Sequence, residues 1–276
     1  MIFYNNKISS TERTLEDIDN KIISTLSTST LKDVNIVNDA VKTMMIPVNG
    51  VYKEVIQIVD SQNRVIWQKN PDLFSFTYQQ VEYISAASNN GAYIDLGITY
   101  DQGCTYELSL IYNGTAYIWG VLQNDLKRAK LEIGIDNIAV FNVGYSALPH
   151  SVSTRTDALT VGESYTLKCT AKDGIVKIEN MTTGHIETRN DAEGKTNFTC
   201  TDNIYLLGQN YESAPRTDGK RTVKSFKYWD KDDNLLRDMI PCYRRSDNVI
   251  GMFDKVSQTF FTNAGTGTFT KGNNVW

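Results

Sequence analysis

Short runs of apolar and aromatic residues, separated by Gly, Asn and Asp, make up the C-terminal two-thirds of the chain. Asn113-Gly114, Asp173-Gly174 and the segment 231–234 each lie between two such runs. Asn-Gly and Asp-Gly supply the positive φ angles that two-residue hairpin turns require, so we expect an antiparallel hairpin at each point. Many short strands joined by such turns, without long amphipathic helices between them, predict a mainly β sandwich or barrel and argue against a parallel α/β sheet.

Residues 9–45 have a different periodicity, which predicts two short helices. Ser9 with Glu12, and Thr30 with Asp33, have the spacing of capping boxes. Apolar residues then recur every three or four positions, as on one face of a helix. They are Leu15, Ile18, Ile22 and Leu26 in the first segment, and Val34, Val37, Val41 and Met44 in the heptad-like second. Helices this short are marginal in water, so they must pack on each other, on the rest of the chain or on further copies of it.

A β-hairpin is predicted after the helical segment. Residues 52–59 form its first strand, 60–63 its turn and 64–67 its returning strand. A lone hairpin is marginally stable, so this one must pair with another segment. The sequence Lys-Asn-Pro-Asp at 69–72 predicts a linker. We therefore expect an attachment or oligomerisation segment at 1–70 and a β-sandwich domain at 74–276.

Composition and charge narrow the possible functions. The net charge of -4 gives no reason to expect nucleic-acid binding, because a phosphate footprint needs clustered Lys and Arg. No apolar run approaches the ~20 residues that span a bilayer, so we expect no membrane insertion. The chain turns polar within its first seven residues, unlike a signal peptide. Without one, we expect the four cysteines, which form no CxxC pair, to be free thiols in strands rather than zinc ligands.

Two segments of the chain resemble a known module. One is 81–86 followed by 91–98; the other is 237–247, continued by 251–254, 260–263 and 265–269. Together they resemble the concanavalin A-like (LamG-like) jelly-roll module of tailed-bacteriophage and prophage virion proteins. The similar region runs from about residue 78 to 272, and between 104 and 208 only the strand pattern matches. The second segment reads as core and turn residues, with positive φ angles expected at Gly265 and Gly267.

The resemblance implies a particular role. The chain would be a structural protein of a phage particle, a fibre or a decoration of head or tail, assembled in the host cytoplasm. Its N-terminal segment would attach to other virion proteins or form a homotrimer, as fibres of the family often do. The jelly roll would project outward and bind a host-surface glycan. An alternative is a bacterial cell-associated protein that binds or cleaves glycans.

The residues needed for catalysis are not found in the sequence. Glucanases that share the jelly roll resemble one another in an E-x-D-x-x-E strand motif that supplies paired carboxylates, and the motif is missing here. Its nearest counterpart is Glu132 with Asp136, which strand parity would place on one face. The acidic cluster at 230–233 fits a solvated turn, and His150 and His185 have no metal-ligand spacing. We therefore expect a non-enzymatic protein with no catalytic residue, metal or cofactor.

The segment 210–221 is the best candidate for a recognition loop. It is long and polar, and loops held by a rigid sandwich often carry function. Its candidate ligand-binding residues are Tyr211, Arg216, Lys220 and Arg221. Trp119 and Trp229, by contrast, follow strand residues and are expected in the core.

Overall fold

The computed structural model describes strands within residues 2–68 and, apart from residue 125 and residues 146–151, the whole of 77–275. The chain divides into two compact units, Met1–Tyr78 and Gln79–Trp276. The expected linker at 69–72 and the expected first helix at 15–26 lie outside the described residues. Separate folding of the two parts stays a prediction. Within the described residues, no helix could span a membrane.

The described elements of the first unit are strands in two small sheets. One sheet has the order β1-β2-β6-β7 and the other β3-β4-β5. Their bounds are β1 Ile2–Tyr4, β2 Lys7–Ser10, β3 Lys32–Val37, β4 Ala40–Val48, β5 Val51–Glu54, β6 Gln57–Asp60 and β7 Val65–Gln68. The expected hairpin is confirmed, since β6 and β7 pair antiparallel with Ile58 opposite Trp67. The expected single strand at 52–59 is instead divided between β5 and β6, which belong to different sheets.

The second predicted helix is wrong. Val34 and Val37 lie in β3, and Val41 and Met44 lie in β4, which pairs antiparallel with β3. β-Branched residues are stiff and favour strands, and sheet pairing here overrides a helical spacing of apolar positions. The stripe therefore cannot form a helical seam, so a trimer rests on the family resemblance alone.

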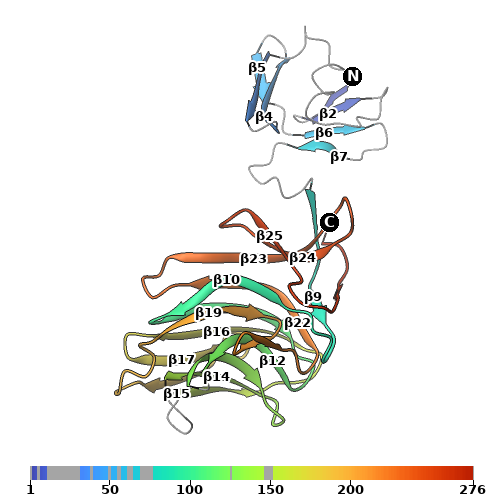
Figure 1. The fold of residues 1–276 in the computed structure, drawn as a ribbon. Helices are drawn as coiled ribbons and strands as arrows, with labels where there is room; N and C mark the ends of the chain where they lie inside the picture. The colour runs from blue at the N-terminus through green and yellow to red at the C-terminus, as the bar shows by residue number, and fades with distance from the viewer. Residues whose placement is uncertain are drawn as a thin grey trace. The chain divides into compact units, whose positions relative to one another are not determined.

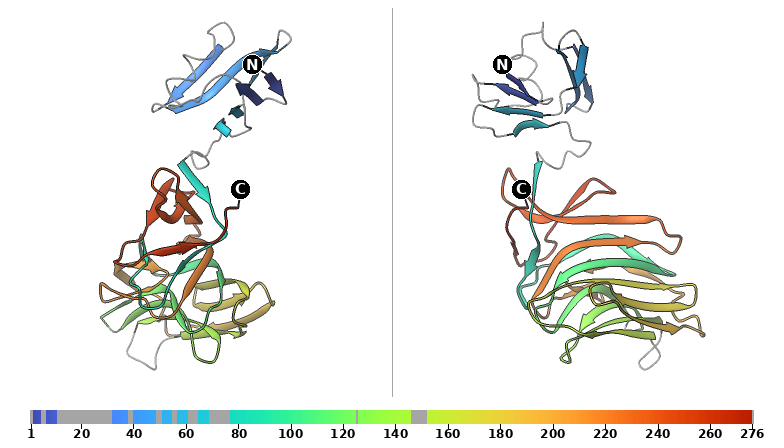
Figure 2. Two further views of the ribbon diagram at one scale, coloured as in Figure 1. Left: turned by 90° about the vertical axis from the view of Figure 1, so that its right-hand side faces the viewer. Right: turned by 180° about the vertical axis from the view of Figure 1, so that it is seen from behind.

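The second unit is a jelly-roll β-sandwich of two sheets. The β12 sheet has the order β10-β19-β12-β13-β14-β15, with β20 paired to β12 and β21 paired to β20. Its strands are β10 Ile94–Asp101, β12 Ala116–Gln123, β13 Lys127–Ile133, β14 Ile138–Tyr145, β15 Val152–Ala158, β19 Thr199–Leu206, β20 Gln209–Tyr211 and β21 Ala214–Arg216. Figure 1 and, from the side and from behind, Figure 2 show the strands of this unit running side by side across its width.

The β11 sheet forms the other layer, in the order β18-β17-β16-β11-β22-β23-β24-β25, with β8, β9 and β26 beside it. The order skips from β16 to β11 and from β11 to β22, so strands far apart in the sequence pair there, as the crossovers of a jelly roll require. The bounds are β8 Tyr78–Gln80, β9 Ile84–Ala86, β11 Cys104–Ile111, β16 Ser164–Lys172, β17 Ile175–Asn180, β18 His185–Asn190, β22 Arg221–Trp229, β23 Leu235–Arg244, β24 Ile250–Asp254, β25 Thr259–Thr262 and β26 Phe269–Lys271.

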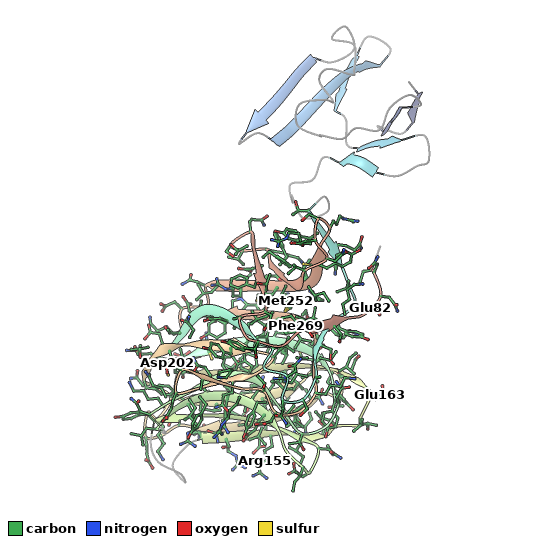
Figure 3. The ribbon with its side chains drawn as sticks, turned by 45° about the vertical axis from the view of Figure 1, so that its right-hand side comes forward. Glu82, Arg155, Glu163, Asp202, Met252 and Phe269 are labelled. Atoms are coloured by element: carbon green, nitrogen blue, oxygen red, sulfur yellow. The ribbon has the colours of Figure 1, made fainter. Side chains whose placement is uncertain are left out.

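One apolar core fills the space between the sheets, because each strand turns alternate residues inward. Tyr106 of β11 stacks on Trp119 of β12 with ring centres 4.3 Å apart, and meets Phe141 of β14 edge-on at 5.4 Å. Trp119 is fully buried, as expected. Figure 3 shows Met252 and Phe269 toward the interior and Arg155, Glu163 and Asp202 at the periphery.

Of the three hairpins predicted in the C-terminal part of the chain, two are confirmed and one is wrong. The Asp173-Gly174 hairpin is confirmed: both residues have positive φ, 54° and 73°, and β16 pairs with β17. The 231–234 hairpin between β22 and β23 is confirmed as well. The Asn113-Gly114 hairpin is wrong, because β11 and β12 belong to different sheets. The turn residues allow a reversal of the chain, but pairing also needs free edges on both strands, and those of β11 are taken by β16 and β22.

The second segment that resembles the jelly-roll module, within 237–269, is called the C-terminal signature below, and it forms a structural network, as its residue types suggested. Asp254 is fully buried and accepts hydrogen bonds from the Asp238 amide at 2.8 Å and the Ser257 hydroxyl at 2.6 Å. Arg237 donates to the Leu96 carbonyl oxygen at 2.7 Å and lies 3.7 Å from the Asp254 carboxylate. These bonds join β10, β23 and the turn after β24, so the signature specifies the fold rather than a ligand.

The expected positive φ angles at Gly265 and Gly267 are wrong, since neither residue lies in the left-handed region. A Cβ on Gly265 would instead collide with the carbonyl oxygen of Gly91, and one on Gly267 with that of Asn90. Close packing of two backbone segments therefore requires glycine here, because no other residue lacks a side chain at the contact.

Candidate functional site

The acidic residues considered for catalysis have structural partners. Glu132 lies in β13 and pairs with Lys130 at 2.7 Å. Asp136 lies in the turn between β13 and β14, so the expected shared strand face is wrong. Asp230 caps its turn, accepting hydrogen bonds from the amides of Asp232 and Asn234, each at 2.9 Å. The part of the chain that the structure describes contains no group of three or more His, Cys, Asp or Glu side chains that could hold a metal ion.

The remaining candidates for reactive or metal-binding residues are the histidines and the cysteines. His185 is exposed in β18, and His150 lies outside the described residues. The four cysteines are free, as expected, and buried in strands of the core: Cys104, Cys169, Cys200 and Cys242. Burial raises the pKa of Cys104 and Cys242 to about 12, so these thiols stay neutral and unreactive at neutral pH.

The expected recognition loop is a β-hairpin for most of its length. Strands β20 and β21 pair with Tyr211 opposite Ala214, and Glu212 and Ser213 turn the chain with φ angles of 50° and 65°. β20 also pairs in parallel with β12, Val121 lying opposite Asn210. The hairpin is therefore fixed to the sheet and can hold its side chains in set positions.

Two of the four predicted residues come together on this hairpin. The Arg216 guanidinium carbon lies 3.7 Å from the centre of the Tyr211 ring and 5.8 Å from the centre of the Tyr117 ring. The Lys130 ammonium lies 5.6 Å from the Tyr117 ring centre. We call Tyr117, Lys130, Tyr211 and Arg216 the aromatic–basic cluster. Tyr117 and Lys130 lacked any sequence signal, because only sheet pairing brings them to the hairpin.

The cluster lies on the outer face of the β12 sheet. Tyr117 is opposite Glu132 in the pairing of β12 with β13, whereas the adjacent Leu131 and Ile133 point into the core. Successive residues of a strand point to opposite faces, so Tyr117 points outward. All four cluster residues are half-buried, which leaves part of each side chain open to solvent.

The other two predicted residues lie apart from the cluster. Arg221 is fully buried and donates to the carbonyl oxygens of Leu207 at 2.8 Å and Ala87 at 2.7 Å. Burial lowers its pKa from 12.5 to about 10. It therefore ties two loops together and has no surface for a ligand. Lys220 is exposed in the turn before β22.

Arg216 and Lys130 differ in whether a carboxylate neutralises their positive charge. Lys130 has Glu132 as its ion-pair partner, whereas Arg216 has no carboxylate partner among the described residues. Gln209, directly opposite Arg216 in the hairpin, is fully buried, and neither atom of its side-chain amide has a hydrogen-bonding partner in the described part of the chain. Such groups are costly unless bonded. Within the cluster, the guanidinium of Arg216 is therefore a cation without a carboxylate partner in the described part of the chain.

Trp229 lies outside the core, contrary to expectation. It is half-buried at the end of β22 and borders a hollow on the outer face of the β11 sheet. Its partner across the strands is Thr105, while the buried neighbour Tyr228 is the residue that points inward.

Comparisons with known proteins show similarity in fold. No protein-family model and no curated protein sequence matches the chain. A heptameric SAP-like pentraxin from Limulus polyphemus is 13% identical over 57% of this chain and 78% of that one, with a TM-score of 0.41. The CBM40 of the Ruminococcus gnavus IT-sialidase, bound to α2,6 sialyllactose, is 17% identical over 52% and 89%, with a TM-score of 0.42. Domains LG4-5 of the mouse laminin α1 chain are 14% identical over 70% and 51%, with a TM-score of 0.45. These similarities concern the sandwich architecture and not the residues of a ligand site.

Proposed function

We propose that the second unit is a non-enzymatic, lectin-like domain that binds a glycan through the aromatic–basic cluster. The observation that carries the proposal is Arg216, held against Tyr211 and near Tyr117 without a carboxylate partner among the described residues. Aromatic rings offer flat apolar faces to sugar rings. A guanidinium offers a fixed fork of donors to hydroxyl or carboxylate oxygens. The two tyrosines preorganise that fork, which lowers the entropy lost on binding.

We propose further that the chain belongs to a bacteriophage particle, as a fibre or a decoration of head or tail, and displays this domain to a host-surface glycan. The support is the resemblance of 81–98 and 237–269 to the phage jelly-roll module. In this proposal the first unit contacts other virion proteins, a homotrimer is the preferred state, and neither nucleic acid nor membrane is a partner. Mass spectrometry of purified particles of the phage whose genome encodes the chain tests this role. Absence of the chain from particles would favour a bacterial cell-associated glycan-binding protein.

Glycan binding is tested with the full chain on a glycan array, followed by titration of the best binder with three variants. Arg216→Ala and Tyr211→Ala should each weaken binding at least tenfold, since an anchoring side chain contributes about 2 kcal/mol and about 1.4 kcal/mol corresponds to a factor of ten. Lys220→Ala is the matched control, because Lys220 is exposed close by in sequence but outside the cluster. Equal affinity of all three variants and the unaltered protein would refute the site.

The absence of catalysis is tested in the same preparations. The ion pair of Glu132 with Lys130 and the turn position of Asp136 support it, because neither arrangement pairs two carboxylates across a bound sugar. We expect no release of reducing sugar from a panel of polysaccharides. Steady release that a single Asp or Glu substitution abolishes would overturn this part of the proposal.

A further inference from the structure

The outer face of the β11 sheet carries a hollow of about 410 Å³ beside Trp229. Thr170, Thr105 and Trp229 lie in one row across β16, β11 and β22, each opposite the next. The residues beside them in their strands (Cys169, Tyr106 and Tyr228) are buried in the core. The row therefore points outward, away from the β12 sheet that carries the aromatic–basic cluster. Lys168, Lys172 and Asp233 complete the lining of the hollow.

The side chains around the hollow leave much of their bonding capacity unused. The side chain of Trp229 has neither a hydrogen bond nor a ring contact within the described residues. Lys168 has no carboxylate within ion-pair distance in that part of the chain, whereas Lys172 pairs with Asp233 at 2.5 Å. The Thr105 hydroxyl donates to that of Thr170 at 3.3 Å, and each oxygen can accept further bonds.

The adjacent row of residues on the same face of the β11 sheet is an ordinary charged surface. Its charges alternate in sign from strand to strand: Glu179, Lys168, Glu107, Lys227 and Asp238. Opposite charges across strands stabilise a sheet, so this row has a structural explanation. Lys168 belongs to this row and also borders the hollow, and no ion pair joins it to Glu107 or Glu179. The row of Thr170, Thr105 and Trp229 has no such pairing, and it leaves part of a large aromatic side chain in water.

We propose that this hollow is a second ligand site, which takes a pyranose ring of a glycan. The sugar ring stacks on Trp229, which offers an apolar face. The hydroxyls of Thr105 and Thr170 and the ammonium of Lys168 bond to its oxygens. The volume lies within the range of about 300–1,000 Å³ that is usual for small-molecule sites. The site does not depend on the aromatic–basic cluster, and the two outer faces let one domain contact two glycan segments.

The experiment titrates the full chain with methyl β-D-glucopyranoside, methyl β-D-galactopyranoside, methyl α-D-mannopyranoside and methyl β-D-glucuronide. Tryptophan fluorescence and saturation-transfer NMR are the readouts. At least one glycoside should bind with a Kd of about 1 mM. The three neutral sugars and the acidic one separate recognition of hydroxyls from recognition of a carboxylate by Lys168.

Trp229→Ala should weaken this binding at least tenfold. Thr170→Arg should do the same, because the longer side chain fills the hollow from the outer face of β16. The second variant keeps the test valid if Trp229→Ala fails to fold. Lys220→Ala should leave it unchanged, because Lys220 is exposed and lies outside both the hollow and the aromatic–basic cluster. The inference is overturned if no glycoside of the panel binds, or if both hollow variants keep the affinity of the unaltered protein.

Discussion

The contact between Gly265 and Gly91 provides a sharp test of how the C-terminal signature works. In Gly265→Ala the new methyl group would meet the Gly91 carbonyl oxygen and lie 2.9 Å from Cε1 of Tyr93. The loop cannot withdraw freely, because the Asn263 carboxamide oxygen accepts from the amides of Gly265 at 2.9 Å and Tyr93 at 3.1 Å. Overpacking costs about 2 kcal/mol and each hydrogen bond lost about 1 kcal/mol, so we expect destabilisation of about 4 kcal/mol.

Gly162→Ala is the matched control for this substitution. Gly162 has a φ of 91°, and a methyl group added there would meet no atom within 4 Å, so only backbone strain acts at this position. Left-handed conformations cost other residues about 1–2 kcal/mol. Urea unfolding of the full chain and both variants measures the difference as a shift in midpoint at constant m-value. If Gly265→Ala costs no more than Gly162→Ala, close packing against residue 91 is not the reason for glycine at 265.

Three further predictions concern stability. Burial raises the pKa of Cys104, Cys200 and Cys242 from 9.0 to about 12; unfolded thiols ionise first, so the free energy of unfolding should fall as pH rises above about 9. Urea titrations at pH 8 and pH 10 measure this, and equal values would contradict the burial. Asp254→Ala leaves buried donors unpaired and should cost about 3–5 kcal/mol. The exposed control Asp232→Ala should cost less than about 1 kcal/mol. Residues 79–276 expressed alone should melt in one cooperative calorimetric transition; a broad transition would show that the first unit completes the fold.

Local patterns in the sequence predict the β class, several turns and the burial of Trp119. Asp173-Gly174 forms a hairpin because two residues that tolerate positive φ stand between strands that alternate in polarity. Trp119 is buried because its strand turns it inward. These features depend on neighbours in the chain, so a local pattern contains them.

The tertiary structure decided which strands pair and therefore which side chains meet. Apolar residues at 34–44 satisfied a helical spacing, yet they form strands, because pairing with another segment outweighs a local preference of a few tenths of a kilocalorie per residue. Asn113-Gly114 connects two sheets instead of two paired strands, since the edges of β11 are occupied. Tyr117 lies near Arg216, and Thr170 and Trp229 line one hollow, only because strands distant in sequence are neighbours in a sheet. Contacts of this kind follow from the order of strands in a sheet, which the alternation of polar and apolar residues within each strand does not encode.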